Sequence, residues 1–136
     1  MITEKVNKDS VVFLYTTCAS REEASSLGLS AIKEHLAVCA DFWAISSIYP
    51  WQNSIEEVDQ YILMLTTNKT LSDKLQKFIE GLHSYSVPMI AILHVAFMNP
   101  SYSFWINRTL NDTEDFKEFD TNKENSDDGY IPGKLK

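Results

Sequence analysis

The 136-residue chain contains few side chains that could do chemistry, and two cysteines with three histidines are the most reactive among them. Thiolate and imidazole groups are ligands for soft or borderline metal ions such as copper and zinc. Cys18 and Cys39 are far apart in sequence, and His35 and His94 have no partner at the spacing of a metal-binding motif. Nothing in the sequence identifies an oxyanion hole or a third, orienting group for a Cys–His nucleophile. We therefore do not predict an enzyme.

An acidic cluster and one arginine could also bind ions, but neither is predicted to do so. Glu56, Glu57 and Asp59 are hard oxygen donors that could attract Ca²⁺ or Mg²⁺, but a solvated hairpin tip is the preferred interpretation. Arg21 follows the first expected strand, where a phosphate-binding arginine could stand. No glycine-rich phosphate loop precedes it, so a phosphatase is not predicted.

Composition excludes several other classes of function. The formal net charge is −7 and the sequence pI is about 4.8. A general nucleic-acid or anionic-membrane binder needs a basic surface, so neither partner is expected. The polar segment 1–10 does not resemble a secretory signal, and the chain has no apolar run long enough to span a bilayer. Two cysteines suit a reducing compartment, which predicts a cytoplasmic protein. No organic cofactor is expected.

The elements that must position these residues follow from the hydrophobic pattern. Apolar runs predict strands over 11–17, 38–49, 55–67 and 89–97, and helical spacing predicts helices over 21–36, from Thr70 to about Gly81, and after Asn99-Pro100. This βαββαβ order predicts an α+β, ferredoxin-like sandwich in which the strands lie in the order 4-1-3-2 and both long helices cover one face. A short C-terminal helix completes a domain over 1–110. Residues 111–136, with eight acidic residues and four lysines, form an acidic polar tail.

The second and third strands form a hairpin longer than a four-stranded sheet requires. It carries Phe42, Trp43, Tyr49 and Trp51, with Gln52 and Asn53 in the expected turn. Either these rings cover the open face of the sheet within one chain, or they pair with a neighbouring subunit. The amount of aromatic surface favours the interface.

A set of short sequence motifs follows in order along the chain. They are LAVC at 36–39, SIYPW at 47–51, EE at 56–57, LTT at 65–67, HSYSVP at 83–88 and NPSY at 99–102, followed by Trp105. Over residues 11–108 the chain resembles the CutA-type divalent-ion tolerance proteins. The resemblance implies a fold similar to that of the P-II nitrogen regulators and a homotrimer formed by strand pairing between subunits. It also implies a non-enzymatic role in tolerance of copper or other divalent cations.

The chain departs from the family pattern at several polar positions of the intersubunit cleft. Gln52-Asn53-Ser54 replaces a usual Gly-Lys, Thr66 replaces a lysine, Ser84 a proline, Met89 a glutamate and Asp41 an asparagine. The scaffold motifs remain, so the trimer is still expected. An anionic ligand has fewer partners in this cleft than in other members.

The resemblance also implies the site residues. Cys39 and His83 match positions linked to copper binding, which predicts weak binding of copper or another divalent metal. The alternatives are a buried Cys39 at a strand start and a His83 that interacts with a helix dipole. Some members carry a further cysteine in the first strand, at the position of Tyr15 in this chain. Cys18 lies three residues after Tyr15, so in a continued strand its side chain would point to the opposite face of the sheet, unless the chain turns there.

A second interpretation is a P-II-like signalling trimer that binds a small molecule in a cleft between subunits. The cleft residues would be the four aromatic side chains and one carboxylate at Trp51, Glu57, Tyr85, Tyr102 and Trp105. For the aromatic residues, packing is the alternative role.

Overall fold

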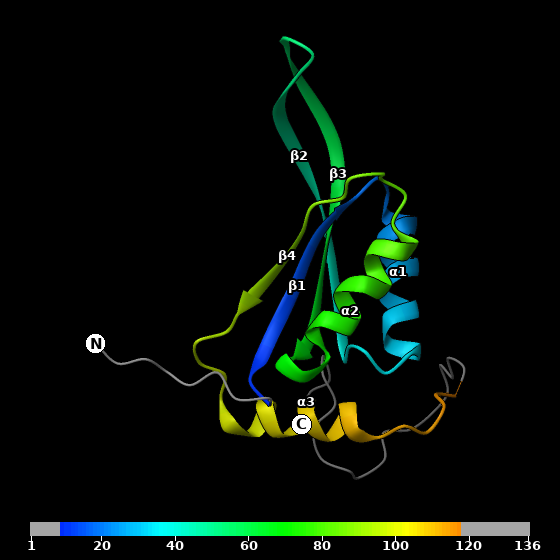
Figure 1. The fold of residues 1–136 in the computed structure, drawn as a ribbon, viewed down its shortest axis with the longest axis vertical. Helices are drawn as coiled ribbons and strands as arrows, with labels where there is room; N and C mark the ends of the chain where they lie inside the picture. The colour runs from blue at the N-terminus through cyan, green and yellow to red at the C-terminus, as the bar shows by residue number, and fades with distance from the viewer. Residues whose placement is uncertain (1–8, 118–136) are drawn as a thin grey trace.

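The computed structural model describes residues 9–117, which form a four-stranded antiparallel sheet with two helices on one face and a third helix across one end (Figure 1). The elements in chain order are β1 (Val11–Cys18), α1 (Arg21–Lys33), β2 (Cys39–Trp51), β3 (Ser54–Asn68), α2 (Lys69–Leu82), β4 (Ile90–His94) and α3 (Pro100–Asn111). The sheet order is β2-β3-β1-β4. The predicted ferredoxin-like topology, with the two most apolar strands in the centre, is therefore confirmed.

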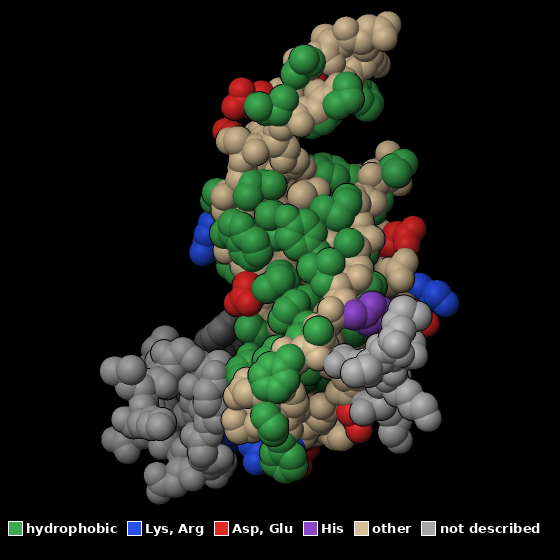
Figure 2. Space-filling model, turned by 90° about the vertical axis from the view of Figure 1, so that its left-hand side faces the viewer, with side chains coloured by type: hydrophobic (Ala, Val, Ile, Leu, Met, Phe, Trp, Pro, Cys, Tyr) green, Lys and Arg blue, Asp and Glu red, His purple; other side chains and the backbone are tan. Residues whose placement is uncertain are grey.

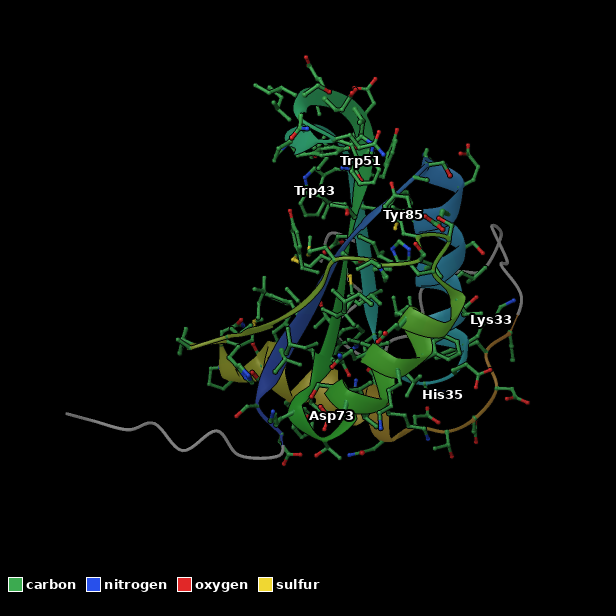
Figure 3. All side chains as sticks on the ribbon, turned by 45° about the horizontal axis from the view of Figure 1, so that its top comes forward. Lys33, His35, Trp43, Trp51, Asp73 and Tyr85 are labelled. Carbon is green, nitrogen blue, oxygen red and sulfur yellow. The ribbon has the colours of Figure 1, made fainter. Side chains whose placement is uncertain are left out.

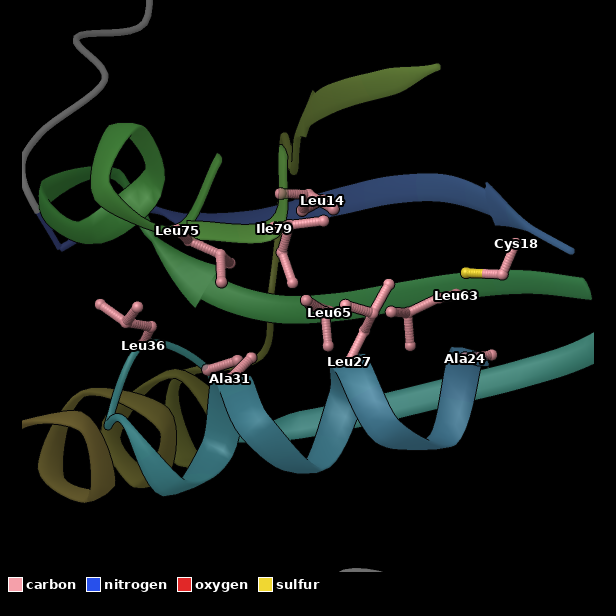
Figure 4. Close-up of a cluster of buried hydrophobic side chains, with 11 residues drawn as sticks. Leu14, Cys18, Ala24, Leu27, Ala31, Leu36, Leu63, Leu65, Leu75 and Ile79 are labelled. Carbon is pink, nitrogen blue, oxygen red and sulfur yellow. The ribbon is translucent and has the colours of Figure 1, made fainter. Parts of the chain in front are cut away.

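Strand register assigns each side chain to one of two faces. Leu14 pairs with Leu65 and Thr16 with Leu63, so these residues share the face that α1 and α2 cover. The core lies between this helix face and the two helices, and Cys18 lies at its edge, at the end of β1 (Figure 4). Its buried members are Leu14, Cys18, Ala24, Leu27, Ala31, Leu36, Ala37, Leu63, Leu65, Leu75 and Ile79.

Helix α1 approaches the sheet closely at Gly28. A Cβ added there would lie 2.7 Å from the Cβ of Ala40 in β2. Alanine is normally the better helix former by about 1 kcal/mol, but here the overlap with a strand methyl group outweighs that gain. We expect Gly28→Ala to lower the free energy of unfolding by roughly 1–3 kcal/mol in denaturant titrations.

Two variants test this prediction. Gly81→Ala in α2 is the matched control, because nothing lies within 4 Å of an added Cβ, and it should be neutral or slightly stabilising. Ala40→Gly added to Gly28→Ala removes the opposing methyl group and should restore part of the loss. A Gly28→Ala protein as stable as the Gly81→Ala protein would contradict the close packing.

Several element ends differ from the predictions for local reasons. The first helix ends at Lys33 instead of 36, because His35 adopts a left-handed conformation with φ 57° that no helix continues. The second helix starts one residue before Thr70, since the side chain of Asn68 accepts a hydrogen bond from the Leu71 N–H and caps it. The fourth strand covers only Ile90–His94 of the predicted 89–97.

The β2–β3 hairpin projects beyond the body of the molecule (Figure 1). Gln52 and Asn53 both have positive φ values, 48° and 65°, which form the tight turn predicted at these residues. The outer hairpin is exposed in the single chain, with Ile48 at 69%, Trp51 at 58% and Ile55 at 79% of full exposure. The hairpin does not fold back onto its own sheet.

The face of the sheet opposite α1 and α2, here called the open face, is apolar. Trp43 lies on it opposite Ile62, and Phe13 and Leu93 are paired on the same face of β1 and β4. Figure 2 shows hydrophobic side chains gathered across this side of the molecule. Helix α3 covers one end of the open face through a cluster that includes Val11, Ile106 and Leu110.

The predicted acidic tail 111–136 lies largely outside the described residues. Of its first residues, Phe116 stacks on the ring of His35 with centroids 4.8 Å apart. None of the described helices combines the length and the apolar character needed to cross a membrane.

Candidate metal site

Three elements bring a thiol, a carboxylate and an imidazole together at one end of the sheet. Cys18 is the last residue of β1, Glu23 is in the first turn of α1, and His83 follows the last residue of α2. One ligand atom from each of the three lies within 4.8 Å of the others. Cys18 and Glu23 are five residues apart in the sequence, and the fold brings His83, 60 residues after Glu23, next to them.

The local structure explains why Cys18 faces the helices. Even-numbered residues of β1 face the helix side, and α1 begins three residues after Cys18 because the Ser20 side chain accepts a hydrogen bond from the Glu23 N–H. Cys18 is fully buried. Burial, with a smaller contribution from the negative charge of Glu23, raises the pKa of the Cys18 thiol to about 12. The thiol is therefore protonated at neutral pH.

The hydrogen bonds of His83 define its tautomer. The Thr17 carbonyl oxygen lies 2.9 Å from Nε2 and can only accept, so Nε2 carries the hydrogen. The Tyr85 backbone N–H lies 3.1 Å from Nδ1 and can only donate, so Nδ1 carries none. The Thr16 hydroxyl, 3.2 Å from Nε2, donates its own hydrogen to the Met89 carbonyl oxygen. His83 is thus a neutral imidazole with both ring nitrogens engaged.

Glu23 is held as an ionised carboxylate. Its Oε1 accepts from the Ala19 N–H and its Oε2 from the Ser84 N–H, both at 2.9 Å. Burial by itself would raise the pKa of Glu23, but the hydrogen bonds from Ser84 and Ala19 lower it below its ordinary value. The carboxylate also joins the segment after β1 to the segment after α2, which fixes the relative positions of Cys18 and His83.

Cys39 is placed elsewhere. It pairs with Thr66, which pairs with Phe13, so its side chain lies on the open face of the sheet. Its Sγ lies 3.5 Å from an Asp41 carboxylate oxygen, and burial, then Asp41, raises the pKa of the thiol to about 11. Because His83 contacts Thr16 on the helix face, the single chain does not bring Cys39 and His83 together.

The five expected cleft residues do not meet within one chain either. Trp51 and Glu57 are on the hairpin, and Tyr85 lies beside its base, where its hydroxyl donates to Gln60 Oε1 at 3.0 Å (Figure 3). Tyr102 and Trp105 pack against each other on α3, at the opposite end of the molecule (Figure 1). A cleft lined by both groups needs a second subunit.

Sequence reasoning missed Glu23 as a candidate ligand and set Cys18 aside. A signal for both was present, since the capping box at Ser20 and Glu23 already requires the chain to turn directly after Cys18. Cys18 also shares its strand face with Leu14 and Thr16. The proximity of His83 could not be read from the sequence, because it depends on where α2 ends against β1.

Comparison with known proteins places this geometry in a family context. Residues 12–109 match the sequence model of the CutA1 divalent ion tolerance proteins. "Protein CutA" of Mus musculus is 30% identical over 100 residues, covering 73% of this chain and 56% of the mouse protein. A probable divalent-cation tolerance protein cutA homolog of Encephalitozoon cuniculi is 31% identical over 97 residues, covering 71% of this chain and 85% of that protein.

A solved structure shows the same fold. The crystal structure of CutA1 from Pyrococcus horikoshii superposes with a TM-score of 0.69 and 30% identity, covering 72% of this chain and 96% of that one. The chain thus spans little more than half of the mouse protein but nearly all of the archaeal one.

Proposed function

Because the chain belongs to the CutA1 divalent ion tolerance family, we propose that it acts as a homotrimeric, non-enzymatic divalent-cation tolerance protein that binds copper or another divalent metal weakly. The observation that carries this proposal is the joint presence, on one small domain, of an uncovered apolar sheet face and of thiol and imidazole side chains at Cys39 and His83. The first suits assembly with copies of the same chain, and the second suits binding of a borderline metal ion.

The assembly part of the proposal is supported by exposed aromatic surface. Trp43 on the open face and Trp51 at the hairpin tip are 42% and 58% exposed in the single chain. Such large rings are enriched at protein interfaces, and the projecting hairpin offers unpaired backbone groups along the outer edge of β2. Packing of three open faces against one another would place α1 and α2 on the outside.

The metal part assigns His83 and Cys39 as ligands, as the family resemblance implies. Since the two lie on opposite faces of one sheet, a site that uses both would be completed by a second subunit, or each would serve a separate site. The donor types favour copper or zinc over Ca²⁺ and Mg²⁺, which prefer oxygen ligands.

The chemistry of the thiols supports the non-enzymatic part. Burial raises the pKa of Cys18 to about 12 and that of Cys39 to about 11. A thiol protonated at neutral pH is a poor nucleophile. We propose that the protein works in the reducing cytoplasm, where both cysteines remain free thiols.

Calorimetric titration with copper tests the metal part. We expect binding in the micromolar range by the wild type and an affinity at least tenfold lower for His83→Ala. Cys39→Ala reports whether the second proposed ligand takes part. Unchanged copper affinity in both variants would refute a site built on these residues.

A P-II-like signalling trimer is the second candidate. It is supported by the position of Tyr85 at the base of the projecting hairpin, where its hydroxyl is bonded to Gln60 and where the proposed trimer would bring in a second subunit. A thermal-shift screen of metals against nucleotides and small organic acids separates the two candidates. Stabilisation by an organic anion, without an effect of copper or zinc, would favour the signalling role.

A further inference from the structure

We infer that Cys18, Glu23 and His83 of the same chain form a three-donor site for a divalent metal ion of borderline softness, such as Zn(II). This inference rests on the proposed function, that the protein binds divalent metal, and specifies the residues that do so. It gives His83 two partners within its own subunit, and it does not use Cys39.

The first argument is distance. The three ligand atoms lie within 4.8 Å of one another, and sulfur and nitrogen bound to one tetrahedral zinc ion are separated by about 3.5 Å. A contraction of about an ångström is within the reach of side-chain rotation. The three backbone segments are already fixed in place, because Glu23 is hydrogen-bonded to the backbone at both Ala19 and Ser84.

The second argument is charge. A metal ion displaces the proton of Cys18, so the ligands become one thiolate, one carboxylate and one neutral imidazole. A divalent ion neutralises this set completely, whereas a monovalent ion such as Cu(I) would leave a negative charge next to the buried Cys18. The site therefore selects for a divalent ion.

The third argument concerns the groups around the ligands. Bound metals commonly take one ring nitrogen of a histidine while the other keeps a hydrogen bond that orients the ring. His83 has such a partner on each side, Thr17 and Tyr85, and gives up one of them when it binds. The two backbone N–H groups on Glu23 hold its carboxylate in the same way.

The arrangement also predicts a site with room for exchange. Three protein donors and an open fourth position are typical of zinc sites that bind water or an exogenous ligand. Among residues 9–117, no fourth cysteine, histidine or carboxylate joins the group. An ion held in this way is exchangeable, unlike one in a closed four-ligand structural site.

The test uses Co(II) as a spectroscopic probe for Zn(II), because thiolate bound to Co(II) gives a charge-transfer band in the near ultraviolet. The decisive variant is Cys39→Ser, in which Cys18 is the one thiol left in the chain. We expect the wild type and Cys39→Ser to bind one Co(II) per chain with this band, and Zn(II) to displace it. Cys18→Ser should lose the band, and Cys18→Ser, Glu23→Gln and His83→Gln should each bind Zn(II) at least tenfold more weakly.

The outcomes separate this inference from the proposed function. Co(II) binding without the band in Cys39→Ser would overturn the Cys18 site while leaving metal binding itself intact. Absence of Co(II), Zn(II) and copper binding in the wild type would refute both. Circular dichroism of each variant checks the fold, and the result for Cys39→Ser decides the question even if Cys18→Ser does not fold.

Discussion

Trp43→Glu is expected to convert the proposed trimer into monomers. Trp43 lies on the open face opposite Ile62 and is 42% exposed in the single chain. If three open faces pack together, each subunit would bury an unpaired carboxylate and lose an aromatic contact, which costs about 3 kcal/mol or more per subunit. Size-exclusion chromatography with light scattering should show the wild type at three times the chain mass of 15.6 kDa and the variant at one chain mass.

Leu29→Glu is the matched control. The exposed fraction of Leu29, 37%, is similar to that of Trp43, but Leu29 belongs to α1 and lies on the helix side of the molecule. This variant introduces the same charge at a position that stays in solvent, so it should assemble as the wild type does. A wild type that is monomeric at micromolar concentration, or a Trp43→Glu protein that remains a trimer, would refute assembly through the open face.

Alkaline pH is expected to destabilise the protein through Cys18. The pKa of this thiol is raised from its ordinary value of 9.0 to about 12, so between these values the folded chain keeps a proton that the unfolded chain releases. The stabilisation is complete below pH 9 and is lost as pH rises towards 12. The contribution of Cys18 to the free energy of unfolding should fall by about 1.4 kcal/mol between pH 8 and pH 10, and by about 4 kcal/mol at its limit.

Cys18→Ala isolates this contribution from the other groups that titrate at high pH. The variant lacks the buried sulfur and is less stable at pH 8, but its stability should decline less steeply. The difference between the two proteins in guanidinium titrations should therefore shrink as the pH rises. Parallel curves for wild type and variant would mean that the Cys18 thiol ionises as easily in the folded chain as in the unfolded one.

The fold was predictable because its signals are local or periodic. The continuous apolar runs at 11–17 and 61–65 identified the two central strands, and the capping box at Ser20 placed the start of α1. The end of α1 was not predictable, since its apolar spacing continues to Leu36 while the chain leaves the helix at Glu34 and His35. That departure depends on packing of Leu36 and Ala37 into the core.

The site was less predictable than the fold. The family resemblance suggested His83 and Cys39 as ligands. That Cys39 lies on the open face could not be predicted, because it depends on the register in which β2 pairs with β3. The capping box gave a sequence signal for Cys18 and Glu23, but their proximity to His83 depends on where α2 ends against β1. Ligands contributed by separate elements leave no spacing pattern in a sequence.

The placement of the two cysteines on opposite faces also determines how the protein responds to oxidation. In the strand register Cys18 is aligned, through Tyr61 of β3, with Ala44 of β2. Cys39 lies five residues from Ala44 along β2, a distance of about 16 Å that is far beyond the reach of a disulfide. A disulfide within one chain is therefore barred, and of the two free thiols Cys18 is buried whereas Cys39 is partly exposed. Any oxidative crosslink has to join the Cys39 residues of two chains, so a non-reducing gel of oxidised protein would show covalent dimers that Cys39→Ser abolishes.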